Sequence, residues 1–73
     1  MEPTDARGAL EQYRKLAKSG GKWSEPALFA AGRLAAELGD TKLARELLDR
    51  YLRRHPKGGN AADARALLAT LAE

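Results

Sequence analysis

The stretch from Leu28 to Pro56 limits most strongly what this chain can fold into. On both sides of Gly39-Asp40, apolar residues recur three and four positions apart, which is the spacing of an amphipathic helix. Glycine readily takes the left-handed conformation that ends a helix, and aspartate accepts hydrogen bonds from the first turn of the next helix. Proline cannot continue the second helix. The stretch therefore predicts two antiparallel helices joined by a tight turn.

The same signals predict four helices in the whole chain. Their expected ranges are 5–18, 25–38, 41–54 and 61–72, and their expected N-cap residues are Thr4 or Asp5, Ser24, Asp40 and Asn60. The chain is rich in alanine and leucine, which favour helices, and it contains no valine or isoleucine, which favour strands. We therefore expect an all-α fold of four helices with antiparallel neighbours.

An internal repeat relates the first helix to the third. A shift of about 35 residues superimposes Asp5, Ala9, Tyr13 and Leu16 on Asp40, Ala44, Leu48 and Tyr51. A repeat of roughly 20–50 residues is typical of helical units that stack on one another. Inside the second helix, Gly32 costs about 1 kcal/mol relative to alanine. That cost predicts that another helix approaches too closely for a side chain at this position.

Length and composition narrow the possible functions. With 73 residues and a formal net charge of +3, the chain is one small domain (1–73), and we expect it to be a fragment of a larger protein. It has no cysteine, and its single histidine has no second ligand or base at a defined spacing, so we expect no enzyme, no metal and no cofactor. No apolar run approaches the ~20 residues of a membrane span, so no direct membrane insertion is expected. The compartment, periplasmic or cytoplasmic, depends on the parent protein.

The helical hairpin resembles the tetratricopeptide (TPR) repeat. The matching positions are Leu28, Gly32, Gly39, Asp40, Ala44, Leu48 and Pro56. Three positions depart from the pattern, because Leu28 and Ala35 replace aromatic residues and Tyr51 replaces a small one. The run from Ala44 to Leu68 is most similar to TPR-like repeats of bacterial envelope proteins, such as outer-membrane assembly lipoproteins and Tol–Pal-associated periplasmic proteins. Similar repeats follow the anti-sigma-factor-like region of some bacterial regulators.

The resemblance implies a non-catalytic scaffold that docks a protein or peptide partner or self-associates into a homo-oligomer. TPR grooves are lined by the exposed side of each repeat's first helix, which here implies Phe29, Arg33, Ala36, Glu37, Asp63, Ala66, Thr70 and Glu73. Phe29 is the expected anchor, because a rigid aromatic ring supplies contact area at low entropic cost. The alternative is that Phe29 packs in the core and Arg33 is solvated. Apolar surface from Ala66, Ala69 and Ala72 would suit a dimer interface.

A basic patch supports an alternative function, the binding of nucleic acid or of an acidic partner. Its members are Arg50, Arg53, Arg54, His55 and Lys57. However, Glu46 and Asp49 each stand four residues before an arginine, which is the favourable order for ion pairs within a helix. Positive charge also stabilises the C-terminal end of a helix. We therefore expect a solvated helix end here rather than a nucleic-acid site.

Trp23 lies in a predicted loop after Gly20-Gly21-Lys22. Tryptophan is enriched at the energetic centres of protein interfaces, so one interpretation is a partner contact. We expect instead that the ring folds back and caps the end of the first helix pair.

Overall fold

The computed structural model describes residues 6–71. Within this range it contains four helices: α1 (Ala6–Lys18), α2 (Ser24–Glu37), α3 (Thr41–Arg54) and α4 (Ala61–Leu71). The described residues include no strand, and the helix ends predicted at residues 18, 25, 38, 41, 54 and 61 each lie within one residue of their predicted position, whereas those predicted at 5 and 72 fall outside the described range. The all-α prediction is therefore confirmed. The predicted caps Thr4 and Asp5, and also Ala72 and Glu73, lie outside the described residues.

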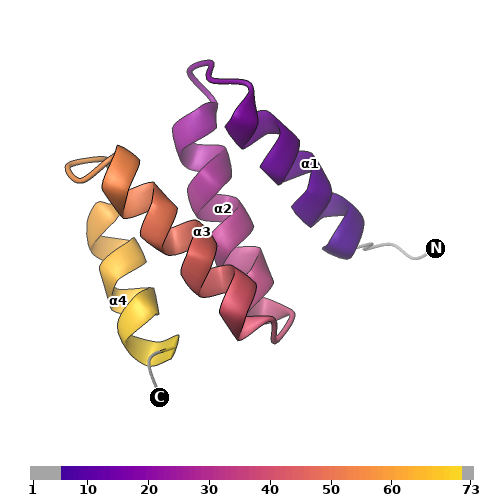
Figure 1. Cartoon of the computed structure of the whole chain (residues 1–73), viewed down its shortest axis with the longest axis vertical. Helices are drawn as coiled ribbons and strands as arrows, with labels where there is room; N and C mark the ends of the chain where they lie inside the picture. Colours follow the sequence, from indigo (N-terminus) through magenta and orange to yellow (C-terminus); the bar gives the residue numbers. More distant parts are fainter. Residues whose placement is uncertain (1–5, 72–73) are drawn as a thin grey trace.

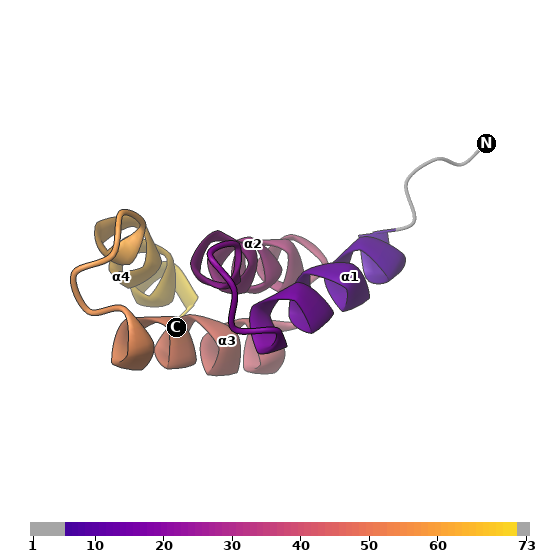
Figure 2. The same ribbon diagram turned by 90° about the horizontal axis from the view of Figure 1, so that it is seen from above.

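Successive helices run antiparallel, so the chain zigzags from α1 to α4 (Figure 1). Seen from above, α2 and α4 lie in one layer and α3 lies in the other (Figure 2). In the same view α1 is slanted, and its C-terminal end lies at the level of α3 (Figure 2). The α2 helix contacts each of the other three helices, and its contact with α3 is the most extensive. The α2–α3 hairpin is therefore the centre of the fold.

The core combines small residues of α2 with large residues of α3. Ala31 and Ala35 of α2 are completely buried, as are Leu48 and Tyr51 of α3. The other buried apolar residues are Leu10, Ala17, Ala27, Leu28, Ala44, Leu47, Ala61 and Ala64. Because α2 contributes mainly alanines, its backbone lies close to its neighbours.

At Gly32 the α2 backbone lies too close to α3 for a side chain. A Cβ atom at this position would lie 2.7 Å from Cδ2 and 2.8 Å from Cγ of Leu48, and 3.5 Å from Cβ of Leu47. The Leu48 side chain is completely buried, so close-packed neighbours limit its movement. The close helix contact that Gly32 predicts is confirmed.

The turn between α2 and α3 has the predicted chemistry. Gly39 adopts a positive φ of 84°, the left-handed conformation expected after a helix. Oδ1 of Asp40 accepts a hydrogen bond from the backbone N–H of Leu43 at 3.2 Å. Asp40 is therefore the N-cap of α3, as predicted.

The predicted N-cap of α2 is wrong. Ser24 is the first residue of α2, the preceding position is occupied by Trp23, and no side chain caps this helix end. Instead, the buried Ser24 hydroxyl donates a hydrogen bond to the backbone carbonyl of Ala17 at 2.7 Å. The last carbonyls of a helix lack partners within that helix, so α1 offers an acceptor here. The serine joins the end of α1 to the start of α2.

Gly32→Ala is expected to lower the free energy of unfolding. Alanine adds about 1 kcal/mol of helix propensity, but an extra methyl group in a packed core costs about 1–3 kcal/mol. Since the added Cβ would overlap Leu48, we expect a net loss of up to about 2 kcal/mol. Urea unfolding followed by circular dichroism measures it.

Gly21→Ala is the matched control for this variant. An added Cβ at Gly21 has no heavy atom within 4 Å, so its unfolding free energy should change by less than about 0.5 kcal/mol. A midpoint for Gly32→Ala equal to or above that of the unmodified protein would contradict the close contact.

Candidate interaction surface

A buried tyrosine of α3 connects α2 to the start of α4. The Tyr51 hydroxyl donates a hydrogen bond to Oε2 of Glu25 at 2.7 Å and accepts one from the backbone N–H of Asn60 at 3.0 Å. The same Oε2 atom of Glu25 also accepts from the N–H of Gly59 at 3.1 Å. The turn before α4 is thereby attached to the first turn of α2. These bonds hold the two helices side by side in one layer (Figure 2).

Two residues of the α3–α4 connection complete this arrangement. A Cβ atom at Gly58 would collide with the Glu25 carboxylate and the Tyr51 hydroxyl, so only glycine leaves room for their hydrogen bond. His55 is half-buried, and its ring centroid lies 5.3 Å from that of Tyr51. The histidine at the end of α3 therefore packs against the tyrosine.

The surroundings of Tyr51 favour its neutral form. Burial raises the pKa of Tyr51 above its ordinary value of 10.0, and the hydrogen bond to Glu25 raises this pKa further. The hydrogen bond from Asn60 acts in the opposite direction, and the charge of Glu25 adds a smaller rise. A charged phenolate would lose solvation in this buried position. Tyr51 therefore keeps the proton that it donates to Glu25.

Phe29, the expected groove anchor, is half-buried on α2 beside Tyr51. The two ring centroids are 5.9 Å apart, and the ring planes are inclined at 61°. This edge-to-face geometry stabilises an aromatic pair by about 0.5–1.5 kcal/mol beyond area burial. One side of the Phe29 ring thus packs against the core, which agrees with the alternative left open by the sequence. Only the rest of the ring is accessible.

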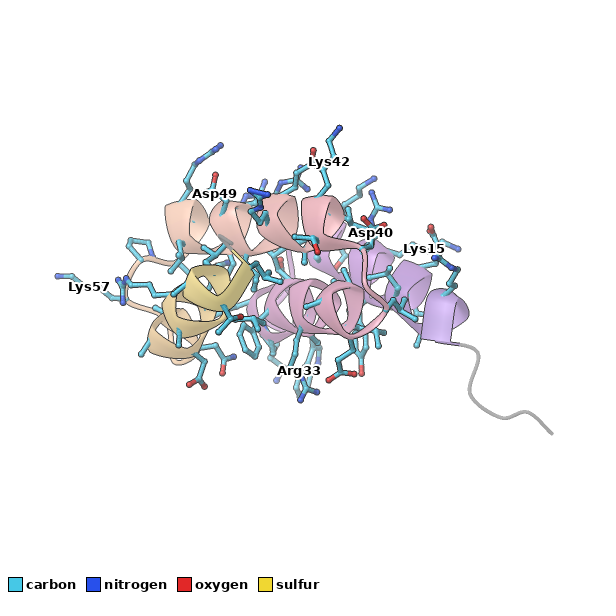
Figure 3. All side chains as sticks on the ribbon, turned by 90° about the horizontal axis from the view of Figure 1, so that it is seen from below. Lys15, Arg33, Asp40, Lys42, Asp49 and Lys57 are labelled. Atoms are coloured by element: carbon cyan, nitrogen blue, oxygen red, sulfur yellow. The ribbon has the colours of Figure 1, made fainter. Side chains whose placement is uncertain are left out.

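The other predicted groove residues within the described range lie on α2 and α4. Ala36 is half-buried, and the exposed members are Arg33, Glu37, Asp63, Ala66 and Thr70. Arg33 projects from α2 on the side away from α3 (Figure 3). The Thr70 hydroxyl donates to the carbonyl of Leu67 in its own helix at 2.7 Å. We call these six residues together with Phe29 the α2/α4 surface.

Trp23 does not fold back as the sequence interpretation expected. The residue is 61% exposed, and Nζ of Lys22 lies 5.8 Å from its ring centroid. Trp23 lines an apolar groove of about 270 Å³ on the side of α1 and α2, together with Tyr13, Leu16, Pro26, Ala27 and Ala30. The ring is available to a partner, because the short turn before α2 leaves it at the edge of the fold.

The predicted basic patch is divided between different faces. Nη2 of Arg53 pairs with Oδ2 of Asp49 at 2.7 Å, as the spacing predicts. The expected pair of Glu46 with Arg50 is not among the ion pairs of residues 6–71. Arg50 instead lines a cleft beside α1.

Sequence reasoning missed the network of Tyr51, Glu25 and Asn60. The Tyr51–Glu25 hydrogen bond joins residues 26 positions apart, and the bond from Gly59 to the same Glu25 carboxylate spans 34 positions, so no local spacing relates these residues. One signal was present: Tyr51 is a large residue where the TPR pattern has a small one. A large side chain at such a position must find space and a partner for its hydroxyl elsewhere.

Tyr51→Phe is expected to lower the free energy of unfolding by about 1–3 kcal/mol at neutral pH, because the Asn60 N–H and Glu25 each lose a partner. It should also change the pH dependence. The folded state has the raised pKa, so the unfolded state loses this proton first and stability falls as pH rises above about 10. Urea unfolding from about pH 8 to 11 should show a steeper decline in the unmodified protein than in the variant.

Tyr13→Phe provides the control for this experiment, because Tyr13 is partly exposed and outside the network. Its stability should decline with pH as in the unmodified protein. Parallel curves for the unmodified protein and Tyr51→Phe would show that Tyr51 does not contribute to this pH dependence.

Comparison with known proteins agrees with the repeat pattern. Residues 26–58, which include most of α2 and all of α3, match the family model described as tetratricopeptide repeat. This match supports a TPR-like repeat in the α2–α3 hairpin, and the four-helix architecture is consistent with a TPR-like helical unit. The similarity to bacterial envelope proteins and regulators stays a prediction.

Other findings concern what the chain does not match or contain. No curated protein and no solved structure significantly matches this chain. Within the described part, no helix is long and apolar enough to cross a membrane. The same residues include no group of three or more His, Cys, Asp or Glu side chains placed to hold a metal ion.

Proposed function

We propose that the chain is a non-catalytic protein-interaction module whose α2/α4 surface docks a segment of a partner protein. The observation that carries this proposal is the lateral pairing of α2 with α4, held by the hydrogen bonds of Tyr51 to Glu25 and Asn60. In TPR-like stacks, helices in these two positions form the wall of the binding groove. The match of residues 26–58 to the TPR model supports the same function.

The exposed charges of the α2/α4 surface suit a polar peptide segment. Arg33, Glu37 and Asp63 are exposed and form no ion pair within residues 6–71. A guanidinium group can hold a partner carboxylate through two parallel hydrogen bonds. Ala36 and Ala66 add little bulk, so a partner backbone can approach, and the accessible part of Phe29 supplies an apolar contact. The proposed partner is therefore a segment with charges of both signs around an apolar residue.

The test uses peptides selected from a displayed random library against the unmodified protein. Arg33→Glu combined with Ala66→Arg should weaken their binding by about tenfold or more, because a pairing charge is reversed and a bulky side chain is added. Fluorescence anisotropy of the labelled peptides measures the affinity. Far-UV circular dichroism should show that the variant remains helical.

Lys42→Glu is the control, because Lys42 projects from α3 on the other side of the molecule (Figure 3). It should leave the affinity for the selected peptides unchanged. Equal binding of these peptides to the unmodified protein and to the α2/α4 variant would reject this surface as the docking site.

A second candidate function, self-association, is favoured by a difference between equivalent residues of α1 and α3. Leu48 and Tyr51 of α3 are completely buried, whereas their repeat equivalents Tyr13 and Leu16 of α1 are 38% and 42% exposed. The α3 helix packs against α2 before it and α4 after it, whereas α1 contacts only α2 among the described helices. In α3 this side is covered by α2, whereas no helix within residues 6–71 covers the equivalent side of α1.

The α4 helix of a second copy suits this side of α1. Ala69 is the ninth residue of α4, as Gly32 is of α2, and it is small and exposed. A small residue at this point would let α1 of the neighbouring copy approach as α3 approaches Gly32. The contact would be head-to-tail, so repeated contacts would build rings or open chains. Trp23 at the edge of the groove would be covered in such an assembly.

Analytical ultracentrifugation tests self-association. The average mass of the unmodified protein should rise with concentration, and Leu16→Glu should suppress the rise because it places a charge in the apolar groove. Thr41→Glu, which adds the same charge at an exposed site on α3, should behave as the unmodified protein. A mass that stays monomeric at every concentration would contradict this second candidate.

A further inference from the structure

A cleft of about 260 Å³ opens between α1 and α3, outside the α2/α4 surface. Its apolar lining consists of Ala17, Leu28 and Leu47, each at most 6% exposed. Its polar lining consists of Arg14, Lys18, Arg50 and Arg54. The lining therefore combines an apolar floor with four cationic side chains and includes no acidic residue.

The helical spacing explains how four cations meet at this cleft. Arg14 and Lys18 are four residues apart on α1, and Arg50 and Arg54 are four residues apart on α3, so each pair shares one helix face. Because both pairs line one cleft, the two helices present these faces to each other. Two members of the basic patch expected from the sequence, Arg50 and Arg54, thus provide half of the cations at the cleft, and Arg14 and Lys18 of α1 provide the other half.

These four charges are poorly neutralised within the described residues. Lys18, Arg50 and Arg54 form no ion pair in residues 6–71. Nη1 of Arg14 lies 3.9 Å from Oε2 of Glu11, a long contact between exposed groups that contributes little. Like charges around one cleft repel each other, so an anion that enters it relieves this repulsion.

Stabilisation of helix ends accounts for only part of the cluster. Lys18 and Arg54 are the last residues of α1 and α3, where positive charge offsets the helix dipole. Arg14 and Arg50 stand four residues earlier, and the dipole effect falls off within the last turn. Their convergence on the cleft therefore needs another reason.

We propose that this cleft binds an acidic segment of a partner protein. Carboxylates of the segment pair with the four cations, and an adjacent apolar side chain lies over Leu28 and Leu47. The apolar floor favours a ligand that carries an apolar group beside its negative charges. Proteins that bind single-stranded nucleic acid stack bases on aromatic side chains, and the lining of this cleft has none. The volume of about 260 Å³ also suits individual side chains rather than a duplex.

The probe is a short fluorescent peptide in which glutamate alternates with leucine. Fluorescence anisotropy should show binding that weakens as salt is raised, because the screening length falls below about 10 Å above 0.1 M salt. A peptide with glutamine in place of glutamate should bind about tenfold more weakly or worse. Absence of binding by the glutamate–leucine peptide at low salt would overturn the proposal.

The decisive comparison uses two double variants on α3. Arg50→Glu with Arg54→Glu should weaken binding by about tenfold or more. Lys42→Glu with Arg45→Glu makes the same change in net charge at exposed residues outside the lining of the cleft, and it should leave the affinity unchanged. Arg50→Gln with Arg54→Gln should also weaken binding, and this variant decides the question if charge reversal prevents folding. Equal losses in the cleft and control variants would overturn the proposal in favour of attraction by net charge.

Two further measurements distinguish a peptide cleft from a nucleic-acid site and from the α2/α4 surface. A thymidine oligonucleotide that binds more tightly than the peptide, and loses binding in the Arg50/Arg54 variant, would make the cleft a nucleic-acid site and overturn the proposal. Arg33→Glu should leave peptide binding at the cleft unchanged. The cleft and the α2/α4 surface can therefore fail or succeed independently.

Discussion

The contact between the α2 backbone at Gly32 and the Leu48 side chain of α3 is the interaction on which the rest of the fold depends. Gly32 thus brings α3 close to the one helix that contacts each of the other three. The same contact brings Tyr51, one turn after Leu48, to a depth from which its hydroxyl reaches Glu25 and Asn60. One position without a side chain thus determines where α4 lies beside α2.

The polar network around Tyr51 compensates for a thin apolar core. A domain of this size buries only about 60% of the surface that its unfolded chain exposes, and the described part of α4 contributes two buried residues, Ala61 and Ala64. Such small side chains provide little hydrophobic stabilisation. Hydrogen bonds from a buried hydroxyl are directional, so they fix the angle of α4 where alanine packing alone would not. The interaction surfaces proposed for this protein rest on that rigid arrangement.

The sequence predicts those features of the fold that depend on neighbouring residues. Helix ends, the Asp40 cap and the need for glycine at position 32 follow from local spacing and backbone preferences, and the structure confirms them. Local spacing does not predict the hydrogen bond of the Ser24 hydroxyl, because its acceptor, the carbonyl of Ala17, belongs to another helix. The convergence of Arg14 and Arg50 on one cleft and the bond of Tyr51 to Glu25 likewise depend on helix packing. The family pattern predicts the candidate surface on α2 and α4. It does not predict the residues that hold this surface in place.

Native-state amide hydrogen exchange tests most directly the claim that the α2–α3 hairpin is the stabilising centre. Amides of α2 around Gly32 and of α3 around Leu48 should exchange slowest and only through global unfolding, whereas those of α1 and α4 should exchange through smaller openings. Protection in α1 or α4 equal to or greater than that in the hairpin would contradict the account. A difference in opening free energy between the amides of α2 and those of α3 would also contradict the account, because the two helices would then not form one cooperative unit.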